Sequence, residues 1–422
     1  MDYFQYKNGE YYAEDVALSR IAQEIGTPFY CYSAATLTRH YQVFAETFAA
    51  LKPQPRICFA VKANPNLAVL ATLGKLGCGA DVVSEGEIRL AMAAAISPER
   101  IVFSGVGKTK EEMAFALKQN IFQFNVESEG ELRALSEVAA ALGKTAPVAL
   151  RVNPDVAPAT HAKISTGGKE TKFGVSMAQA PALYALAASL PGIAVRGVSV
   201  HIGSQLTELE PFALAFKRVR SFVDELRAAG HAIHTVDLGG GLGIPYNKNK
   251  AAPPLPAAYG ELVKREMAGV DAQLIFEPGR MMAGNAGVLV TRVIYVKQNG
   301  ARNFIIVDAG MNDLIRPTLY EAYHEIVPVQ QRAGAKEIAA DVVGPVCETG
   351  DIFAEGRTLP QPQPGDLLAF RSAGAYGASM ASTYNARPLV AEVMVQGDRW
   401  AVTRPRQKYD EIIMAYRIPC WL

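Results

Sequence analysis

The lysine at position 62 stands where an amine could do chemistry. Lys62 follows the short apolar run Cys58-Phe59-Ala60-Val61 and precedes the polar turn Ala63-Asn64-Pro65-Asn66. An amine at the end of a buried strand is partly desolvated, so it loses its proton more easily and can form a Schiff base with an aldehyde. The alternative is a lysine whose stem covers apolar surface while its ammonium group stays in water.

Three contiguous glycines, Gly239, Gly240 and Gly241, follow another apolar run. Because glycine lacks a Cβ atom, the backbone can approach a ligand closely and present N–H groups to an anion. Ser204 and Arg280 follow two further apolar runs and could complete a phosphate site. The glycines do not match the dinucleotide fingerprint, and an ordinary turn is the alternative.

Glu277 and His201 also come directly after apolar runs. The carboxylate could form an ion pair with Arg280, or it could keep a heterocyclic nitrogen protonated. The histidine could be a core residue, or its flat imidazole could stack on a ring. Together with a lysine for an aldehyde and a phosphate site, these residues indicate a site for pyridoxal 5'-phosphate, whose protonated ring withdraws electrons from a substrate α-carbon.

Eight short apolar runs between residues 56 and 279 alternate with amphipathic stretches rich in Ala, Leu and Glu. The runs are Ile57 to Val61, Ala80 to Val83, Ile101 to Ser104, Ile121 to Val126, Val148 to Val152, Val195 to His201, Thr235 to Leu238 and Gln273 to Phe276. Eight such strand–helix units predict an α/β fold with a closed, TIM-like (β/α)8 barrel, and an open doubly wound sheet is the alternative. The candidate residues follow the runs, as expected for a barrel enzyme.

The alternation of predicted strands and helices ends after Arg280. Six strand-like runs with few helix signals between them predict a C-terminal all-β domain. These runs are Val288 to Val296, Phe304 to Val307, Ala340 to Val343, Asp366 to Phe370, Val390 to Val395 and Trp400 to Thr403. A further strand at Phe29 to Tyr32 suggests that residues 1–34 pack with this domain. We therefore expect an N-terminal segment at 1–34, a barrel at 35–285 and a β-domain at 286–422.

Bulk composition excludes several classes of partner. The chain has 422 residues, half of them apolar, with 42 Lys and Arg against 41 Asp and Glu. No basic run suggests a nucleic acid or a membrane surface, and neither a signal peptide nor a membrane-spanning run is expected. The five cysteines lack the spacing of a zinc or redox site, so we expect no metal and a reducing, cytoplasmic location.

Five segments in this order resemble the diaminopimelate decarboxylases, which belong to the alanine-racemase-like (fold-type III) class of pyridoxal phosphate enzymes. They are Phe59-Ala60-Val61-Lys62-Ala63-Asn64, His201-Ile202-Gly203-Ser204-Gln205, Gly239-Gly240-Gly241-Leu242-Gly243, Glu277-Pro278-Gly279-Arg280 and Cys347-Glu348-Thr349-Gly350-Asp351. Residues 160–167 with 172–174, and residues 315–320, also fit. Thr349 and Phe59 depart slightly from the family pattern. The resemblance implies decarboxylation of meso-2,6-diaminopimelate to L-lysine and carbon dioxide, the last step of lysine biosynthesis, by a homodimer.

The resemblance also implies a role for each site residue. Lys62 would carry the cofactor, His201 would stack on its ring and Glu277 would pair with the pyridine nitrogen. The other cofactor contacts would be Ser204, Gly239, Gly240, Gly241, Gly279, Arg280 and Tyr376. The substrate contacts would be Arg280, Arg316, Tyr320, Glu348 and Tyr376. Cys347 would donate a proton from the second subunit.

Purely structural roles for these residues, and other classes of protein, are the alternatives to this interpretation. Arg316 and Glu348 could be surface charges, and Cys347 could be an inert buried thiol. A sister decarboxylase of ornithine, arginine or lysine typically has aspartate after the cysteine, where this chain has Glu348. An alanine racemase would be shorter. A catalytically inactive decoy homologue is the alternative of a different class, and the intact Lys62, Glu277 and Cys347 argue against it.

Overall fold

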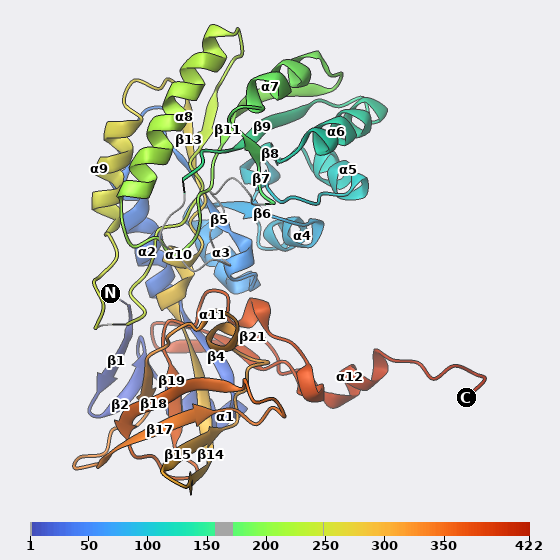
Figure 1. Ribbon diagram of the computed structural model, residues 1–422. Helices are drawn as coiled ribbons and strands as arrows, with labels where there is room; N and C mark the ends of the chain where they lie inside the picture. The colour runs from blue at the N-terminus through green and yellow to red at the C-terminus, as the bar shows by residue number, and fades with distance from the viewer. Residues whose placement is uncertain (1, 157–171, 248) are drawn as a thin grey trace. The chain divides into compact units, whose positions relative to one another are not determined.

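The computed structural model describes residues 2–156, 172–247 and 249–422, which form two compact units (Figure 1). The first, here called the β unit, comprises Met1–Leu37, Tyr246–Lys250 and Ala283–Leu422. The second, the barrel unit, comprises Thr38–Pro245 and Ala251–Met282. The stretch at 160–167 that fits the family pattern lies outside the described residues. The predicted domain boundaries stay a prediction.

Among the described residues of the barrel unit, eight parallel strands close into a ring. In spatial order they are β9 (Ala146–Asn153), β11 (Ile193–Ser199), β12 (Thr235–Asp237), β13 (Gln273–Phe276), β5 (Arg56–Ala60), β6 (Gly79–Val82), β7 (Ile101–Phe103) and β8 (Gln123–Val126). β8 pairs with β9 and closes the ring, and the short β10 (Val175–Ser176) flanks β9. The closed ring confirms the predicted barrel and excludes the open sheet.

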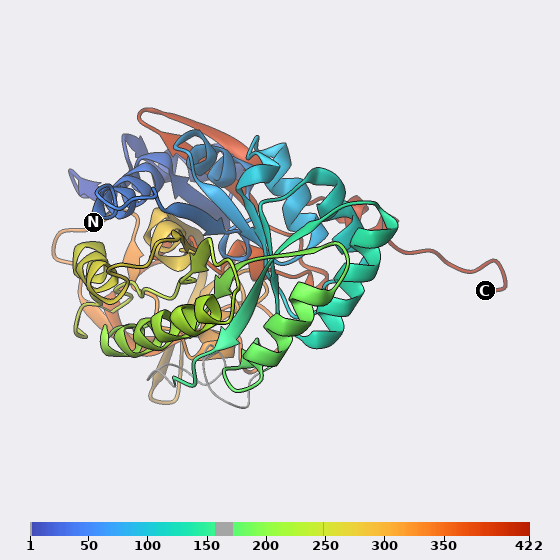
Figure 2. The same cartoon turned by 90° about the horizontal axis from the view of Figure 1, so that it is seen from above.

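Helices surround these strands, as the view from above in Figure 2 shows. They are α2 (Ala34–Thr47), α3 (Leu67–Lys75), α4 (Glu85–Ala93), α5 (Lys110–Gln119), α6 (Glu129–Ala141), α7 (Ala180–Ser189), α8 (Glu210–Ala228) and α9 (Pro256–Glu266). Side chains stabilise their first turns: Ser84, Thr109 and Ser128 each accept a backbone N–H from the third helical residue. The parallel strands are buried, and polar side chains such as Asp81, Asn125 and Asp237 lie among their apolar residues.

The β unit is built on a mixed sheet. Its order is β18 (Ile352–Pro360), β17 (Glu337–Val343), β15 (Arg302–Val307), β14 (Gly287–Asn299), β4 (Phe29–Ser33), β20 (Ala391–Gln396) and β21 (Arg399–Arg404). β19 (Leu367–Phe370) pairs with β14 and with β16 (Ile326–Pro328). The helices α1 (Leu18–Ile25), α11 (Arg316–Tyr320) and α12 (Tyr409–Met414) also belong to this unit, so it is mainly rather than wholly β.

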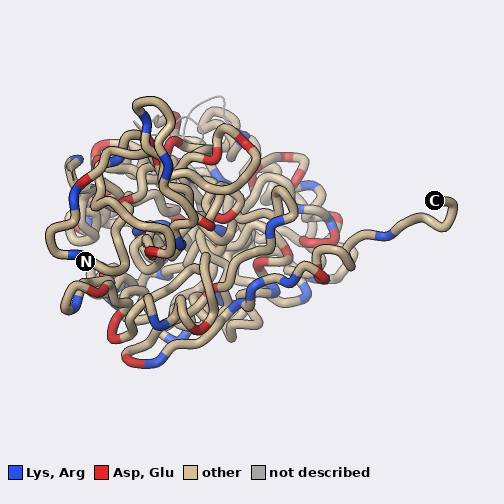
Figure 3. The backbone as a smooth tube through the Cα atoms, turned by 90° about the horizontal axis from the view of Figure 1, so that it is seen from below, with Lys and Arg blue, Asp and Glu red and all other residues tan. Residues whose placement is uncertain are grey.

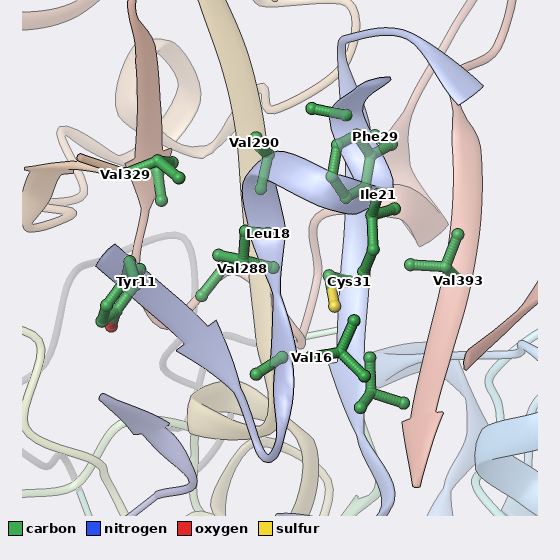
Figure 4. Close-up of a cluster of buried hydrophobic side chains, with 14 of the residues drawn as sticks. Tyr11, Val16, Leu18, Ile21, Phe29, Cys31, Val288, Val290, Val329 and Val393 are labelled. Carbon is green, nitrogen blue, oxygen red and sulfur yellow. The ribbon is translucent and has the colours of Figure 1, made fainter. Parts of the chain in front are cut away.

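Residues from the beginning of the chain enter the core of the β unit. A small sheet of β1 (Phe4–Lys7), β2 (Glu10–Ala13) and β3 (Val16–Ala17) precedes α1. Tyr11, Leu18 and Phe29 pack in one buried cluster with Val288 and Val393 (Figure 4). Full burial of such a side chain stabilises the fold by roughly 1.5–3 kcal/mol. The first thirty residues are therefore part of this unit's core.

Charged residues of both signs are interspersed along the backbone of the chain (Figure 3). This agrees with the near balance of 42 basic and 41 acidic residues. Among the residues that the structure describes, no helix combines the length and the apolar character needed to cross a membrane.

Candidate active site

Lys62 lies in a short 3-10 turn, Val61–Ala63, directly after β5. Its Nζ atom is 3.2 Å from Oδ2 of Asp81, which lies on the neighbouring strand β6. The Asp81 side chain is fully buried, whereas the Lys62 side chain is 40% exposed. The amine is therefore held by a fixed anion and is still open to a ligand.

His201 follows β11 and accepts a hydrogen bond at Nδ1 from the backbone N–H of Gly240, at 3.2 Å. A nitrogen that accepts carries no proton, so the neutral ring has its proton on Nε2. Burial and the positive charges of Arg151 and Lys62 lower the pKa of His201 well below its usual value. The imidazole is thus a neutral, oriented ring, which suits stacking.

The glycine turn after β12 is conformationally restricted to glycine. Gly239 and Gly241 have φ angles of +65° and +113°. A Cβ atom on Gly240 would collide with the carbonyl oxygen of Glu277. The N–H of Gly239 bonds to Asp237 Oδ1 at 2.9 Å, and that of Gly240 bonds to His201. These two N–H groups fix the turn, a role not foreseen in the sequence, and contact of the glycines with a phosphate stays a prediction.

Ser204, in the loop after β11, and Arg280, after β13, contact each other across the end of β12. The Oγ atom of Ser204 accepts from Nε and Nη2 of the buried Arg280 at 3.3 and 3.0 Å. The loop that carries Ser204 is joined to the glycine turn, because Leu206 N–H bonds to the carbonyl oxygen of Gly241 at 2.9 Å. A hydroxyl, a guanidinium and a glycine turn are thereby assembled at the ends of three adjacent strands, a donor set that fits a phosphate.

Glu277 follows β13 and is buried. Its Oε1 atom accepts from Asn125 Nδ2 at 3.3 Å and from Ser104 Oγ at 3.4 Å. It also shares a hydrogen bond with the carboxyl group of Asp237. Burial, followed by the charges of Asp237 and Asp81, raises the pKa of Glu277 well above its usual value, and burial raises the pKa of Asp237 to about 6. Both carboxyl groups therefore bind a proton more tightly than exposed carboxyl groups do.

Asp237, Asn125 and Ser104 were not singled out in the sequence. A usable signal was present, because Asn125 and Asp237 are polar residues inside runs that otherwise read as buried strand. A buried polar side chain needs a partner, and a polar residue in an apolar strand often marks a site. What the sequence could not show is that the barrel brings β8, β12 and β13 together around Glu277.

Ser84 and Glu87 brace the end of β6. Ser84 Oγ accepts the N–H of Glu87 at 3.2 Å, and Glu87 Oε2 accepts the N–H of Val83 at 2.8 Å. Burial raises the pKa of Glu87 to about 7. Together they stabilise the first turn of α4, close to Asp81 in the sequence.

A buried ion pair fixes the loops after β7 and β9. Arg151 Nη1 lies 3.0 Å from Glu127 Oε1. The two carboxylate oxygens of Glu127 also accept the backbone N–H groups of Gly105 and Gly174, at 3.0 and 3.1 Å. The pair places a guanidinium near His201 and helps to keep that imidazole neutral.

In the β unit, Arg316 is buried and begins α11. His324 donates from Nδ1 to the carbonyl oxygen of Arg371 at 2.8 Å, so its Nε2 is free to accept from Arg316 Nη1, also at 2.8 Å. The Arg316 guanidinium also lies 4.6 Å from the ring centroid of Tyr246. Arg316 is therefore a fixed, buried cation and not a surface charge.

Cys347 and Glu348 are exposed in the loop between β17 and β18. Asp351 fixes this loop, because its carboxylate accepts the N–H groups of Met311 at 2.6 Å and Val346 at 2.7 Å. The N–H of Cys347 bonds to Asn385 Oδ1 at 2.8 Å. Cys347 therefore lies on an exposed loop, and the alternative of a buried thiol is wrong.

Tyr376 has a φ angle of +56°, which is uncommon for a tyrosine. It stands between Gly374 and Gly377, where added Cβ atoms would collide with the carbonyl oxygens of Ala283 and Ala373. A strained residue held by tight neighbours is often part of a working site. Tyr320 is half-buried at the end of α11.

The comparisons with known proteins agree with this site. Residues 34–284 match the model of the pyridoxal binding domain of pyridoxal-dependent decarboxylases. Diaminopimelate decarboxylase from Zymomonas mobilis is 52% identical over 420 residues, 99% of each chain, and that from Pseudomonas aeruginosa is 50% identical over 412 residues, 98% of each chain. The structure of diaminopimelate decarboxylase from M. jannaschii in complex with L-lysine has a TM-score of 0.95 at 38% identity and covers 100% of this chain and 99% of that one.

Fold and site together define a barrel enzyme that depends on pyridoxal phosphate. The donor set fits this cofactor: an amine for its aldehyde, a carboxyl group for its ring nitrogen, a neutral imidazole for its face, and a hydroxyl with a guanidinium for its phosphate. The resemblance seen in the sequence is confirmed, since the full-length identities show that the chain belongs to the diaminopimelate decarboxylase family of pyridoxal-dependent decarboxylases.

Proposed function

We propose that this chain decarboxylates meso-2,6-diaminopimelate to L-lysine and carbon dioxide, as the last step of lysine biosynthesis. The observation that carries the proposal is the 52% identity to a diaminopimelate decarboxylase over 99% of both chains. A relative from Helicobacter pylori, with a TM-score of 0.90, 40% identity and coverage of 94% of this chain and 98% of that one, has a structure in complex with L-lysine, the proposed product.

The bound cofactor supplies an electron-withdrawing ring that accepts the electron pair left behind when the α-carboxylate departs. Lys62 provides the attachment point, and Asp81 holds its amine at 3.2 Å. Glu277 would pair with the ring nitrogen, and His201 would stack its neutral imidazole on the ring. Ser204, Gly239, Gly240, Gly241, Gly279, Arg280 and Tyr376 hold the remainder of the cofactor.

The substrate differs from ornithine or arginine because its distal end carries a carboxylate as well as an amine. A carboxylate calls for guanidinium groups, and an amine calls for an anion. Arg280 and Arg316 are buried cations with fixed orientation, and Glu348 is an exposed anion. With Tyr320 and Tyr376 they form the proposed substrate contacts. Holding both ends of the substrate aligns the bond to the departing carboxylate with the electron-accepting ring.

Cys347 protonates the α-carbon after carbon dioxide has left, and it reaches the site from a second copy of the chain. The exposed thiol on a fixed loop supports this role. The proposed assembly is a homodimer with shared active sites. Free thiols at Cys347 and Cys420, both exposed, suit the reducing cytoplasm, which we propose as its location.

The C-terminal arm, residues 409–422, supports association with a second copy. Its large apolar side chains are 63% to 90% exposed: Tyr409, Ile413, Met414, Tyr416, Ile418, Trp421 and Leu422. A large aromatic side chain buries roughly 150–250 Å². The arm could therefore bury on the order of 800 Å², which matches one side of a standard protein interface.

The test is carbon dioxide release from meso-2,6-diaminopimelate, ornithine, arginine and lysine by the purified protein, with a visible absorption scan of the same sample. We expect a bound chromophore and release from meso-diaminopimelate alone. Release from ornithine, arginine or lysine instead would assign a sister decarboxylase. A protein without turnover of any of the four would be the inactive homologue.

A further inference from the structure

The buried guanidinium of Arg316 contacts two aromatic rings of the β unit. Its Nη1 atom donates to Nε2 of His324 at 2.8 Å, and its central carbon lies 4.6 Å from the ring centroid of Tyr246. The rings of Tyr246 and His324 also contact each other, edge to face, with centroids 5.5 Å apart. Arg316 is 5% exposed and His324 is 1% exposed. His324 and Tyr246 have no role in the function proposed above.

The sheet of the β unit fixes the imidazole of His324. His324 precedes β16, and Arg371 follows β19, the strand that pairs with β16. The backbone N–H of Arg371 bonds to the carbonyl oxygen of Glu325 at 2.8 Å. The carbonyl oxygen of Arg371 accepts from His324 Nδ1, also at 2.8 Å, and Arg357 Nη1 donates to the carbonyl oxygen of His324 at 3.0 Å. The backbone and the ring of His324 are therefore both held in place.

These contacts decide the tautomer of His324. A guanidinium has N–H donors and no acceptor, so the Nε2 atom beside Arg316 accepts, and Nδ1 carries the proton that is donated to Arg371. The accepting imidazole and the face of the Tyr246 ring both stabilise a cation. A carboxylate in place of the imidazole would do so too, but its charge would compete with that of a substrate carboxylate. The two rings thus orient the guanidinium without neutralising it.

We propose that His324, together with Tyr246, is a positioning residue that orients the Arg316 guanidinium toward the distal carboxylate of the substrate and so sets the preference for ligands that carry one. The inference rests on the substrate contact of Arg316 proposed above. A bidentate bond between a guanidinium and a carboxylate needs both groups in one plane, so a guanidinium that rotates binds a carboxylate less tightly. A distal amine makes no such demand. Loss of the His324 contact should therefore weaken only ligands that have the distal carboxylate.

Two variants of His324 separate its two side-chain hydrogen bonds. In His324→Asn, the amide nitrogen can take the place of Nδ1 and donate to Arg371, but the acceptor for Arg316 is lost. In His324→Gln, the amide oxygen can take the place of Nε2 and accept from Arg316. Tyr246→Leu, which removes the aromatic ring, and Tyr246→Phe, which keeps it, form a second matched pair.

The experiment is a calorimetric titration of the cofactor-loaded, full-length protein with L-lysine, the proposed product, and with cadaverine, the same diamine without the carboxylate. We expect H324N to bind L-lysine about tenfold more weakly than the wild type does, with the affinity for cadaverine unchanged. H324Q should bind both ligands nearly as the wild type does. The control His234→Asn changes an exposed histidine that precedes β12 and should match the wild type.

Steady-state kinetics give a second readout. In H324N the KM for meso-diaminopimelate should rise by a similar factor while kcat changes little, a split that a general loss of structure would not produce. Unchanged affinity of H324N for L-lysine, or equal weakening of L-lysine and cadaverine, would overturn the inference and leave the proposed decarboxylation standing. If H324N failed to fold, an unchanged preference for L-lysine in Y246L would overturn it. A wild type that bound L-lysine no better than cadaverine would overturn both this inference and the proposed substrate contact of Arg316.

Discussion

At the scale of residues, the site depends on side chains whose charge is set by their surroundings. Lys62 contacts a buried carboxylate, His201 is kept neutral, and Glu277 is paired with Asp237. None of these states can be read from residue type alone. The types and the order of Lys62, His201 and Glu277 were nevertheless enough to indicate the cofactor.

Removal of the Lys62 amine tests its assigned role. We expect Lys62→Ala to lose the visible absorbance of bound cofactor and to reduce turnover at least a thousandfold, ~4 kcal/mol in activation free energy. The measurements are an absorption scan and carbon dioxide release. The control Lys75→Ala removes an exposed lysine on α3 and should retain both. A coloured, active K62A protein would contradict the assignment.

The Arg316 side chain should act on substrate binding more than on chemistry. We expect Arg316→Lys to raise KM for meso-diaminopimelate about tenfold to a hundredfold, because an ammonium cannot bind a carboxylate in the bidentate way, while kcat changes little. Steady-state kinetics give both values. A large fall in kcat with unchanged KM would place Arg316 in the chemical step instead.

At the scale of elements, function comes from turns that follow buried strands. The eight barrel strands could be predicted within a few residues, because parallel strands covered on both faces are continuous apolar runs. β18 was missed because Glu355-Gly356-Arg357-Thr358 interrupts its apolar pattern. The Asp237–Asn125 contact was missed because it joins residues 112 positions apart that only barrel closure brings together.

The glycine turn after β12 should not tolerate a side chain. We expect Gly240→Ala to lower cofactor affinity and to destabilise the protein by about 1–3 kcal/mol, because its Cβ atom would displace Glu277. The measurements are cofactor titration and urea unfolding. The control Gly130→Ala lies in α6 with open space around it and should stabilise by up to about 1 kcal/mol. Normal cofactor binding by G240A would contradict the role of the turn.

The cap of α4 should make stability depend on pH. The pKa of Glu87 is about 7 in the fold, above its ordinary value of 4.5, so the folded state binds the proton more tightly than the unfolded state does. The contribution of Glu87 to stability is therefore present below pH 4.5 and is lost as the pH rises through 7. Relative to Glu87→Gln, the wild type should lose unfolding free energy between pH 5 and 8. A difference that stays constant across this range would contradict the raised pKa.

At the scale of the whole molecule, the proposed active site combines residues from two copies of the chain. Lys62 belongs to the barrel unit, and Cys347 belongs to the β unit. If each site combines Lys62 of one copy with Cys347 of the other, a mixture of inactive Lys62→Ala and Cys347→Ala proteins should regain about a quarter of wild-type activity, because each mixed dimer has one intact site. A mixture of K62A with the double variant K62A/C347A is the control. No gain after subunit exchange would contradict a shared site.

The central claim is tested most directly by following L-lysine formation from meso-2,6-diaminopimelate with the purified, cofactor-loaded protein. The account predicts one L-lysine and one carbon dioxide for each substrate consumed, and no product with Lys62→Ala. A cofactor-loaded wild-type protein that left meso-diaminopimelate unchanged while it decarboxylated ornithine, arginine or lysine would contradict it.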